Sequence, residues 1–389
     1  MLRKLSFIIG PGASLASCMP STNAITQQTL SGNGIVRHTD GCFCFAPPLY
    51  GMPDEYVPKL IAFLHILKAE VDLYYSANTN RVTNYEDIYY IASQIHDSES
   101  GEYDNPAIGP LAEKVRTIHR GVLHGRLWDE DSDWDLIETS EETTNYIRDT
   151  ARYMLATPPK RIDQYDLLKA RFEDNNFIKL DIFTLNHDTI IEQNLAHHCL
   201  PFIDGFDSPA NNLRPWRPEL YDSSGERDIR LFKLHGSVNW FRFGHLQHPS
   251  IAIASGDIWH TKNATGKYNW PSEGRSEMLL GTFNKMLSYS KAGYSQLHNH
   301  FHTSFHSSHC LIVSGFSFNG KAINSTIINW ASSSEPRKMV IIHPNPDALK
   351  RTARPSISRQ LDEWIAKGLV SIIPKRIEES NWDEIQKHL

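Results

Sequence analysis

The chain has 389 residues, of which 40% are hydrophobic and 22% are charged, and its formal net charge at pH 7 is −6. These values are ordinary for a folded protein of one or two domains, and the charge is too small to predict a nucleic-acid or membrane surface. No run approaches the roughly 20 apolar residues of a membrane span, and the five cysteines, an odd number, argue against a disulfide framework and for a reducing compartment.

The predicted elements begin with the apolar run LSFIIG at 5–10, which favours a buried strand that a glycine ends. Basic residues precede this run, but it is shorter than the about 7–15 apolar residues of a secretory signal, so we expect a cytoplasmic protein. Residues 20–50 are rich in Ser, Thr, Asn, Gly and Pro and are predicted to be loop. From about 54 to 176, apolar residues recur at helical spacing. Further strands are predicted at 179–184, 230–234, 310–314, 339–343 and 369–376.

Strands that alternate with helical segments predict an α/β fold, with a parallel sheet and helices on both of its faces. We predict a core domain from residues 1–50 and 177–389, and a helical insertion at 51–176. Residues 206–280, rich in Pro, Trp, Gly and Ser, are predicted to be a small irregular insertion within the core.

Ligands bind open parallel sheets at the carboxyl ends of the strands, so the residues that follow the predicted strands are candidates for a site. Gly10-Pro11-Gly12-Ala13-Ser14 follows the first strand, and its glycines would let the backbone approach a pyrophosphate. Leu15 occupies the place of the third Gly or Ala of the dinucleotide fingerprint, so a tight turn without a ligand is an alternative.

Two further strand ends carry polar side chains. Thr184, Asn186, His187 and Asp188 follow the strand at 179–184, where Asn or Asp could simply cap the next helix. His235 follows the strand at 230–234, where a histidine could also be a structural residue.

The strand at 310–314 leads into Gly315-Phe316-Ser317-Phe318. The next residue is Asn319, so the G-x-S-x-G pattern of a serine hydrolase is absent. Gly315 would allow close approach of a ligand, and Ser317 offers a hydroxyl to a phosphate or ribose.

Together and in this order, GPGAS, TLNHD, LHG and GFSF resemble motifs of the sirtuin superfamily, and more closely those of its bacterial branch, the Sir2-type NAD hydrolases of anti-phage defence. NYEDIYY at 84–90, DGF at 204–206 and GTFNKM at 281–286 extend the resemblance, which runs from residue 7 to about 345. Pro11 and His187 depart from the usual motifs. The resemblance implies a Rossmann-like fold with NAD as substrate. The C-x-x-C pairs of deacetylating sirtuins are absent, which argues against deacetylation.

The resemblance also implies roles for single residues. Asn186 would orient a water molecule, since an amide both donates and accepts hydrogen bonds. His235 would hold the ribose hydroxyls and act as the base, and Asp188 would orient Asn186 or bind the ribose. Gly10, Gly12, Ala13 and Ser14 would line the pyrophosphate. The predicted NAD-binding residues are Gly10, Gly12, Ala13, Ser14, Thr184, Gly315, Phe316, Ser317, His343 and Asn345.

We therefore expect an NAD+ glycohydrolase that releases nicotinamide and ADP-ribose. A protein deacylase, an ADP-ribosyltransferase and a non-catalytic module that binds NAD or ADP-ribose are the alternatives. Unchecked hydrolysis would deplete the cell's own NAD, so a partner is expected to control it. The resemblance implies abortive infection as the role, a homo-oligomer, and a HerA-type translocase ATPase or, alternatively, a short Argonaute system as partner. We expect no direct binding to membranes or nucleic acids.

Two patterns imitate metal sites, and we expect no metal at either. Cys42 and Cys44 lack the second pair that a zinc site needs. HNHFHTSFHSSH places His298, His302 and His306 at helical spacing but has no glutamate to complete H-E-x-x-H. We predict a packed helix with exposed imidazoles there.

Overall fold

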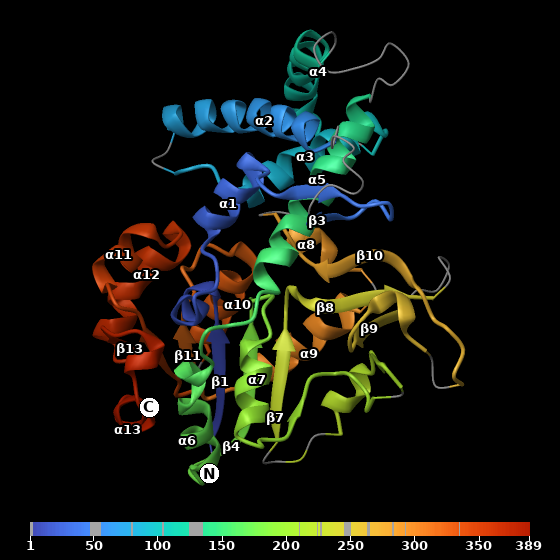
Figure 1. The fold of residues 1–389 in the computed structure, drawn as a ribbon. Helices are drawn as coiled ribbons and strands as arrows, with labels where there is room; N and C mark the ends of the chain where they lie inside the picture. Colours follow the sequence, from blue (N-terminus) through green and yellow to red (C-terminus); the bar gives the residue numbers. More distant parts are fainter. Residues whose placement is uncertain are drawn as a thin grey trace. The chain divides into compact units, whose positions relative to one another are not determined.

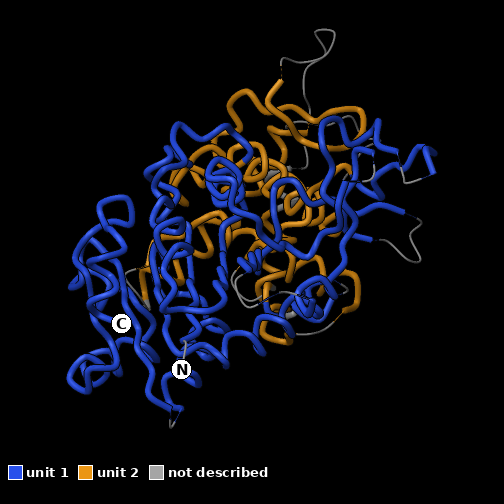
Figure 2. Tube along the Cα trace, turned by 90° about the horizontal axis from the view of Figure 1, so that it is seen from below, with its two compact units in different colours: residues 1–19, 156–273, 286–389 blue, residues 20–155, 274–285 orange. Residues whose placement is uncertain are grey.

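The computed structural model describes residues 3–46, 56–78, 81–102, 105–123, 135–209, 211–223, 225, 228–244, 250–262, 265–281, 284–291, 293–333 and 335–389. The chain divides into two compact units, which Figure 2 colours separately. The first unit comprises residues 1–19, 156–273 and 286–389, and the second comprises 20–155 and 274–285. These bounds differ from the predicted domain boundaries, which stay predictions because a compact unit need not coincide with a domain.

The first unit is built on a seven-stranded sheet with the order β13-β12-β11-β1-β4-β7-β5. Every neighbouring pair in it is parallel. Parallel strands that are covered on both faces read as continuous apolar runs, which is why the sequence revealed most of them. The strands are β1 Arg3–Ile9, β4 Phe177–Thr184, β5 Phe202–Ile203, β7 Ile229–Lys233, β11 Cys310–Ser314, β12 Lys338–Ile342 and β13 Val370–Ile373. The predicted Rossmann-like α/β fold is confirmed.

Helices cover both faces of this sheet. The connection from β4 to β5 through α7 runs toward one edge, and the connection from β7 to β11 through α9 runs toward the other. Because such crossovers are right-handed, α7 and α9 lie on opposite faces, in front of and behind the sheet in Figure 1. Among the described residues, no helix has both the length and the apolar character needed to cross a membrane. The helices of this unit are η1 Pro11–Ser17, η4 Asp163–Tyr165, α6 Leu167–Glu173, α7 Ile190–His197, η5 Pro218–Tyr221, η6 Ile258–His260, α9 Tyr294–His306, α10 Lys321–Ala331, α11 Pro346–Thr352, α12 Pro355–Ala366, η7 Ile377–Glu379 and α13 Trp382–Gln386.

Residues 206–280, predicted to be irregular, instead contain several strands. β6 Leu213–Pro215 and β8 Gly236–Phe243 both pair antiparallel with β9 Ser250–Ala254, and β10 Pro271–Met278 follows. A small hydrophobic cluster of Leu213, Phe241, Phe243 and Ala252 lies between the paired strands. Antiparallel strands can leave one face to solvent, so polar residues interrupt their apolar ones and the sequence resembles a loop.

The second unit is mostly helical, as the spacing of apolar residues predicted. The prediction that residues 20–50 form a loop is wrong for residues 22–31, 35–37 and 43–45, because α1 Thr22–Ser31 and two short strands lie there. The Ser21 hydroxyl caps α1 by accepting a hydrogen bond from the Ala24 N–H at 3.2 Å. Residues 47–50 lie outside the described residues. The other elements are β2 Ile35–Arg37, β3 Phe43–Phe45, α2 Tyr56–Asn78, α3 Tyr85–Glu99, η3 Pro106–Ile108, α4 Gly109–Leu123 and α5 Leu136–Leu155. The helix α8 Asn284–Ser288 begins in the second unit and ends in the first.

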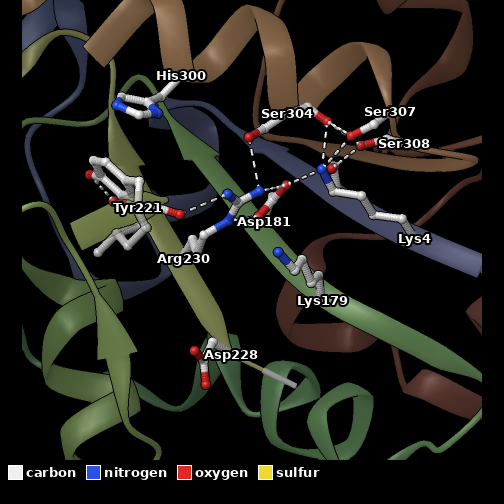
Figure 3. A network of polar contacts seen from close by, with 12 residues as sticks. Lys4, Lys179, Asp181, Tyr221, Asp228, Arg230, His300, Ser304, Ser307 and Ser308 are labelled. Atoms are coloured by element: carbon white, nitrogen blue, oxygen red, sulfur yellow. Dashed lines mark hydrogen bonds and ion pairs between the residues drawn. The ribbon is translucent and has the colours of Figure 1, made fainter. Parts of the chain in front are cut away.

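A buried ion network crosses the middle of the large sheet (Figure 3). Asp181 on β4 accepts two hydrogen bonds from Arg230 on β7, at 2.7 and 2.8 Å, and lies 2.8 Å from the Lys4 ammonium on β1. Ser304 on α9 accepts hydrogen bonds from both cations, through its hydroxyl from Arg230 at 2.8 Å and through its carbonyl from Lys4 at 2.7 Å. The network therefore fixes α9 against three neighbouring strands.

Candidate active site

The four predicted motifs follow four strands that are neighbours in the sheet, in the order β11-β1-β4-β7, and His343 and Asn345 follow the next strand, β12. Ile9 is level with Ser314 on one side and with Thr184 on the other. Thr184 is in turn level with Lys233, so Asn186 and His235, each two residues further along, leave the sheet side by side. The topology thus brings segments that are far apart in the sequence to one edge, where ligands bind sheets of this type.

A chain of hydrogen bonds links the segment that follows β1 to the segment that follows β4. The Asn186 Nδ2 donates to the Ser14 hydroxyl at 2.9 Å, and the Ser14 hydroxyl donates to Asp188 Oδ2 at 2.8 Å. All three side chains are buried, with exposed fractions of 2% for Ser14, 4% for Asn186 and 5% for Asp188. Ser14 therefore lies between Asn186 and Asp188 of the TLNHD motif.

This chain of hydrogen bonds decides which way the Asn186 amide points. A carboxylate only accepts hydrogen bonds, so the single hydroxyl proton of Ser14 is used on Asp188. Ser14 can then only accept from Asn186, which must present its NH2 group to the serine. The Asn186 Oδ1 is buried and has no hydrogen-bond partner among the described residues. A buried acceptor without a partner is costly, and a water or a ligand hydroxyl would satisfy it.

Asp188 has further contacts that support its loop. Its Oδ1 accepts a hydrogen bond from the Ile190 N–H at 3.1 Å, at the start of α7, so the capping alternative is also realised. The buried Lys233 ammonium donates to the Asp188 carbonyl and pairs with Glu192 Oε1 at 2.9 Å. Burial raises the pKa of the Glu192 carboxyl, and Lys233 opposes that rise. The loop after β4 is therefore held from β7 and from α7.

The glycines of the first and fourth motifs pack against each other. The Gly10 N–H donates to the Ser314 carbonyl at 2.9 Å, and a Cβ on Gly10 would lie 2.5 Å from the Gly315 oxygen. Gly315 has a φ of +66°, and its Cβ would lie 2.2 Å from the Ala13 nitrogen. Both positions therefore need glycine for the contact between the two loops. The predicted role of these loops in holding a pyrophosphate stays a prediction.

His235 lies beside two other rings. Its Nε2 is 3.2 Å from the Tyr289 hydroxyl, and its ring centroid is 6.2 Å from that of His187. The His187 carbonyl accepts hydrogen bonds from the Val238 N–H at 3.0 Å and from the Ser237 hydroxyl at 3.1 Å. These contacts tie the loop after β4 to the start of β8, and they keep the His187 and His235 rings close to each other.

Comparison with known families agrees with this geometry. Residues 181–370 match the family model of the SIR2-like domain. This chain carries a SIR2-like domain. The match confirms the resemblance to Sir2-like proteins, and because SIR2-like domains bind NAD, it supports an NAD-related activity. A search of curated proteins found no match to the chain.

Thr184, Ala13 and Phe316 are buried parts of the frame around these strand ends. Thr184 is buried, and its hydroxyl accepts a hydrogen bond from the Asn186 N–H at 3.1 Å, which shapes the turn. Ala13 is buried beside Gly315. Phe316 is buried, and its ring packs on Phe318 with centroids 5.0 Å apart.

The residues predicted to hold the adenosine side make local hydrogen bonds. Ser317 is exposed, and its hydroxyl accepts from Asn319 Nδ2 at 3.1 Å. Asn345 caps α11 by accepting from the Ala348 N–H at 2.9 Å. His343 Nδ1 accepts from the Asn345 N–H at 3.1 Å, and burial lowers the pKa of its imidazole. His343 and Asn345 follow β12, one strand further from β1 than β11, and their predicted roles stay untested.

Four residues near the site escaped the sequence analysis as site residues: Tyr165, Lys233, Tyr289 and His298. Tyr165 is fully buried with its hydroxyl 3.5 Å from that of Ser14, and burial, together with the nearby Asp188, raises the pKa of its phenol. The prediction of exposed imidazoles on the histidine-rich helix is wrong for His298, which is 5% exposed. Lys233 directly precedes the LHG motif, and this position could have drawn attention to it; Tyr165 and Tyr289 carry no local signal.

The described residues contain no group of three or more His, Cys, Asp or Glu side chains that could hold a metal ion.

Proposed function

We propose that this protein is an NAD+ glycohydrolase, which cleaves NAD+ to nicotinamide and ADP-ribose. The observation that carries the proposal is the buried Asn186 Oδ1, which has no hydrogen-bond partner among the described residues and is oriented by Ser14 and Asp188. It lies at the strand ends of a SIR2-like domain, beside a second strand end that carries His235. An acceptor held in this way is suited to orienting the water that attacks a sugar carbon.

The proposed reaction needs no general acid. The bond from the anomeric carbon to the pyridinium nitrogen breaks with its electron pair on the nitrogen, so nicotinamide leaves as a neutral molecule. The anomeric carbon, left with oxocarbenium character, forms a bond to the water oxygen. Asn186 Oδ1 would accept a hydrogen bond from that water, and His235 would take up the proton that the water loses and release it to solvent. Such positioned proton transfer contributes typically about 10²–10⁴-fold in rate.

The cysteine content favours hydrolysis over the alternative of protein deacylation. The chain has five cysteines, with Cys42 and Cys44 in one C-x-C pair and no C-x-x-C pair. The zinc module typical of deacetylating sirtuins therefore has no counterpart in the sequence.

We also propose that a partner controls the reaction, since unchecked hydrolysis would exhaust the NAD of the cell that makes the protein. A HerA-type ATPase in an anti-phage system is our first candidate, and a short Argonaute system is the second. Nicotinamide release by the purified protein, measured alone and with each candidate partner, tests this control.

The central experiment measures nicotinamide release from NAD+ by chromatography. Asn186→Ala and His235→Ala should each lower turnover by at least about 100-fold, because each removes a group that acts on the water. Asn33→Ala and His388→Ala are matched controls at exposed positions and should keep full turnover.

Two further measurements separate the outcomes. Acetylated peptide is added in parallel, and NAD+ consumption that requires the peptide would support the deacylase instead. ADP-ribose binding is measured by calorimetry, so that binding without turnover identifies a non-catalytic module. Full turnover in both site variants would contradict the assignment.

A further inference from the structure

Four rings form a row that begins at the site and ends on α9. The His187 and His235 centroids are 6.2 Å apart, and the His235 and Tyr289 rings are nearly parallel with centroids 6.4 Å apart. The Tyr289 and His298 rings stack closely, with centroids 3.6 Å apart and an interplanar angle of 25°. Tyr289 therefore lies between the imidazole of the site and an imidazole of the histidine-rich helix.

The last ring of the row, His298, also contacts the backbone next to His235. His298 Nε2 lies 3.1 Å from the carbonyl oxygen of Leu234, the residue that directly precedes His235. A carbonyl only accepts, so Nε2 of His298 carries the proton. Burial lowers the pKa of His298 to about 4, so this imidazole is neutral near pH 7. His235, Tyr289 and His298 thus form a closed ring of contacts, which the Leu234 carbonyl completes.

The helix that carries His298 is firmly placed. Phe301 and Phe305 pack on Phe183 of β4, with ring centroids 4.8 and 5.7 Å away. One turn further, Ser304 accepts hydrogen bonds from the buried Lys4 and Arg230 (Figure 3). His298 therefore projects from a rigid support, as a group that positions another side chain should.

We propose that Tyr289 is a positioning residue that holds the His235 imidazole through its hydroxyl, and that His298 holds Tyr289 by stacking against its ring. The proposal rests on the proposed function for the role of His235 in the reaction. It gives the histidine-rich helix a use that needs no metal. It also explains why a histidine is buried there, since only a flat side chain with an N–H can both stack on Tyr289 and donate to the Leu234 carbonyl.

The kinetic test uses Tyr289→Phe, which keeps the ring and removes the hydroxyl. We expect kcat for nicotinamide release to fall about 10-fold while KM stays within about two-fold, because the base is mispositioned and the substrate is still bound. Tyr268→Phe, the same change on a tyrosine that is 55% exposed, is the control and should match the wild type. A packing role alone predicts no change in Tyr289→Phe, and that result would overturn the proposal.

A second readout does not depend on turnover. Long-range ¹H–¹⁵N spectra of protein with ¹⁵N-labelled histidine report which ring nitrogen carries the proton, and His235→Ala identifies the His235 signals. We expect Tyr289→Phe to shift the His235 ring nitrogens. Unchanged His235 signals would contradict the proposal even if the wild type hydrolysed NAD+. If Tyr289→Phe shifts the His235 signals but the wild type shows no hydrolysis, the proposed function is wrong and the positioning of His235 by Tyr289 still holds.

Discussion

Two buried polar groups lie along the same three strands of this protein, and they differ in whether their hydrogen bonds are complete. In the middle of the sheet, Lys4, Asp181 and Arg230 pair with one another and with Ser304 on α9. At the carboxyl edge, the chain through Ser14 ends at Asn186, whose Oδ1 has no partner among the described residues. We call the first group closed because its members have partners, and the second open because its Asn186 acceptor has no partner among the described residues.

We propose that the closed network mainly stabilises the fold and that the open acceptor serves the reaction. Burying ions is costly unless each finds partners, so a closed network is destabilised as a whole when one member is removed. An acceptor that is left open also lowers stability, and a protein keeps it where a water or substrate will complete it. Each prediction below tests whether the two groups divide these tasks.

The largest effect is expected at the closed network. Asp181→Ala would leave Lys4 and Arg230 buried without their common anion, and we expect the free energy of unfolding to fall by about 3–5 kcal/mol. Urea denaturation followed by circular dichroism measures this loss. Asp362→Ala is the control: its side chain is 75% exposed and pairs with Lys350, so about 1 kcal/mol or less is expected. Equal midpoints for the two variants would show that the network is not essential to the fold.

An effect on stability of up to about 3 kcal/mol is expected from His298, whose helix serves both groups. The pKa of His298 is lowered by burial from 6.5 to about 4 in the folded protein, so the unfolded chain takes up the proton first as the pH falls. Stability should therefore decrease between about pH 6.5 and 4.

His298→Gln removes this titration. When the pH is lowered from 7 to 4.5, the wild type should lose more unfolding free energy than His298→Gln. His388→Gln, at an exposed position, should follow the wild type at both pH values. A pH-independent difference for His298→Gln would mean that this imidazole is not held neutral.

The smallest expected effect is also the sharpest comparison, because it exchanges one hydroxyl in each region. Ser14→Ala removes the acceptor that orients Asn186 and should lower kcat/KM for nicotinamide release about 10-fold, with a stability change within about 1 kcal/mol. Ser6→Ala removes a buried hydroxyl that contacts Ser308 and should cost about 1 kcal/mol of stability without changing turnover. Equal losses of turnover in both variants would refute the division of tasks.

Much of the sheet could be predicted because buried parallel strands appear in the sequence as continuous apolar runs. The runs at 310–314 and 339–343 correspond to β11 Cys310–Ser314 and β12 Lys338–Ile342. The helix α1 was missed because its sequence is polar, with Ile25 as its one buried residue of high hydrophobicity beside Thr26 and Thr29. Local patterns report burial, and an element that buries little leaves a weak pattern.

By itself, the sequence determined which residues stand at strand ends, since an apolar run that stops at Asn186 or His235 is visible in any linear reading. Only the tertiary structure decided what those residues touch. It placed Ser14 between Asn186 and Asp188, and it brought Tyr289 and His298 to His235. These contacts join segments that are far apart in the chain. They depend on which strands pair and on how α9 packs, and side-chain packing of that kind leaves no periodic trace in the sequence.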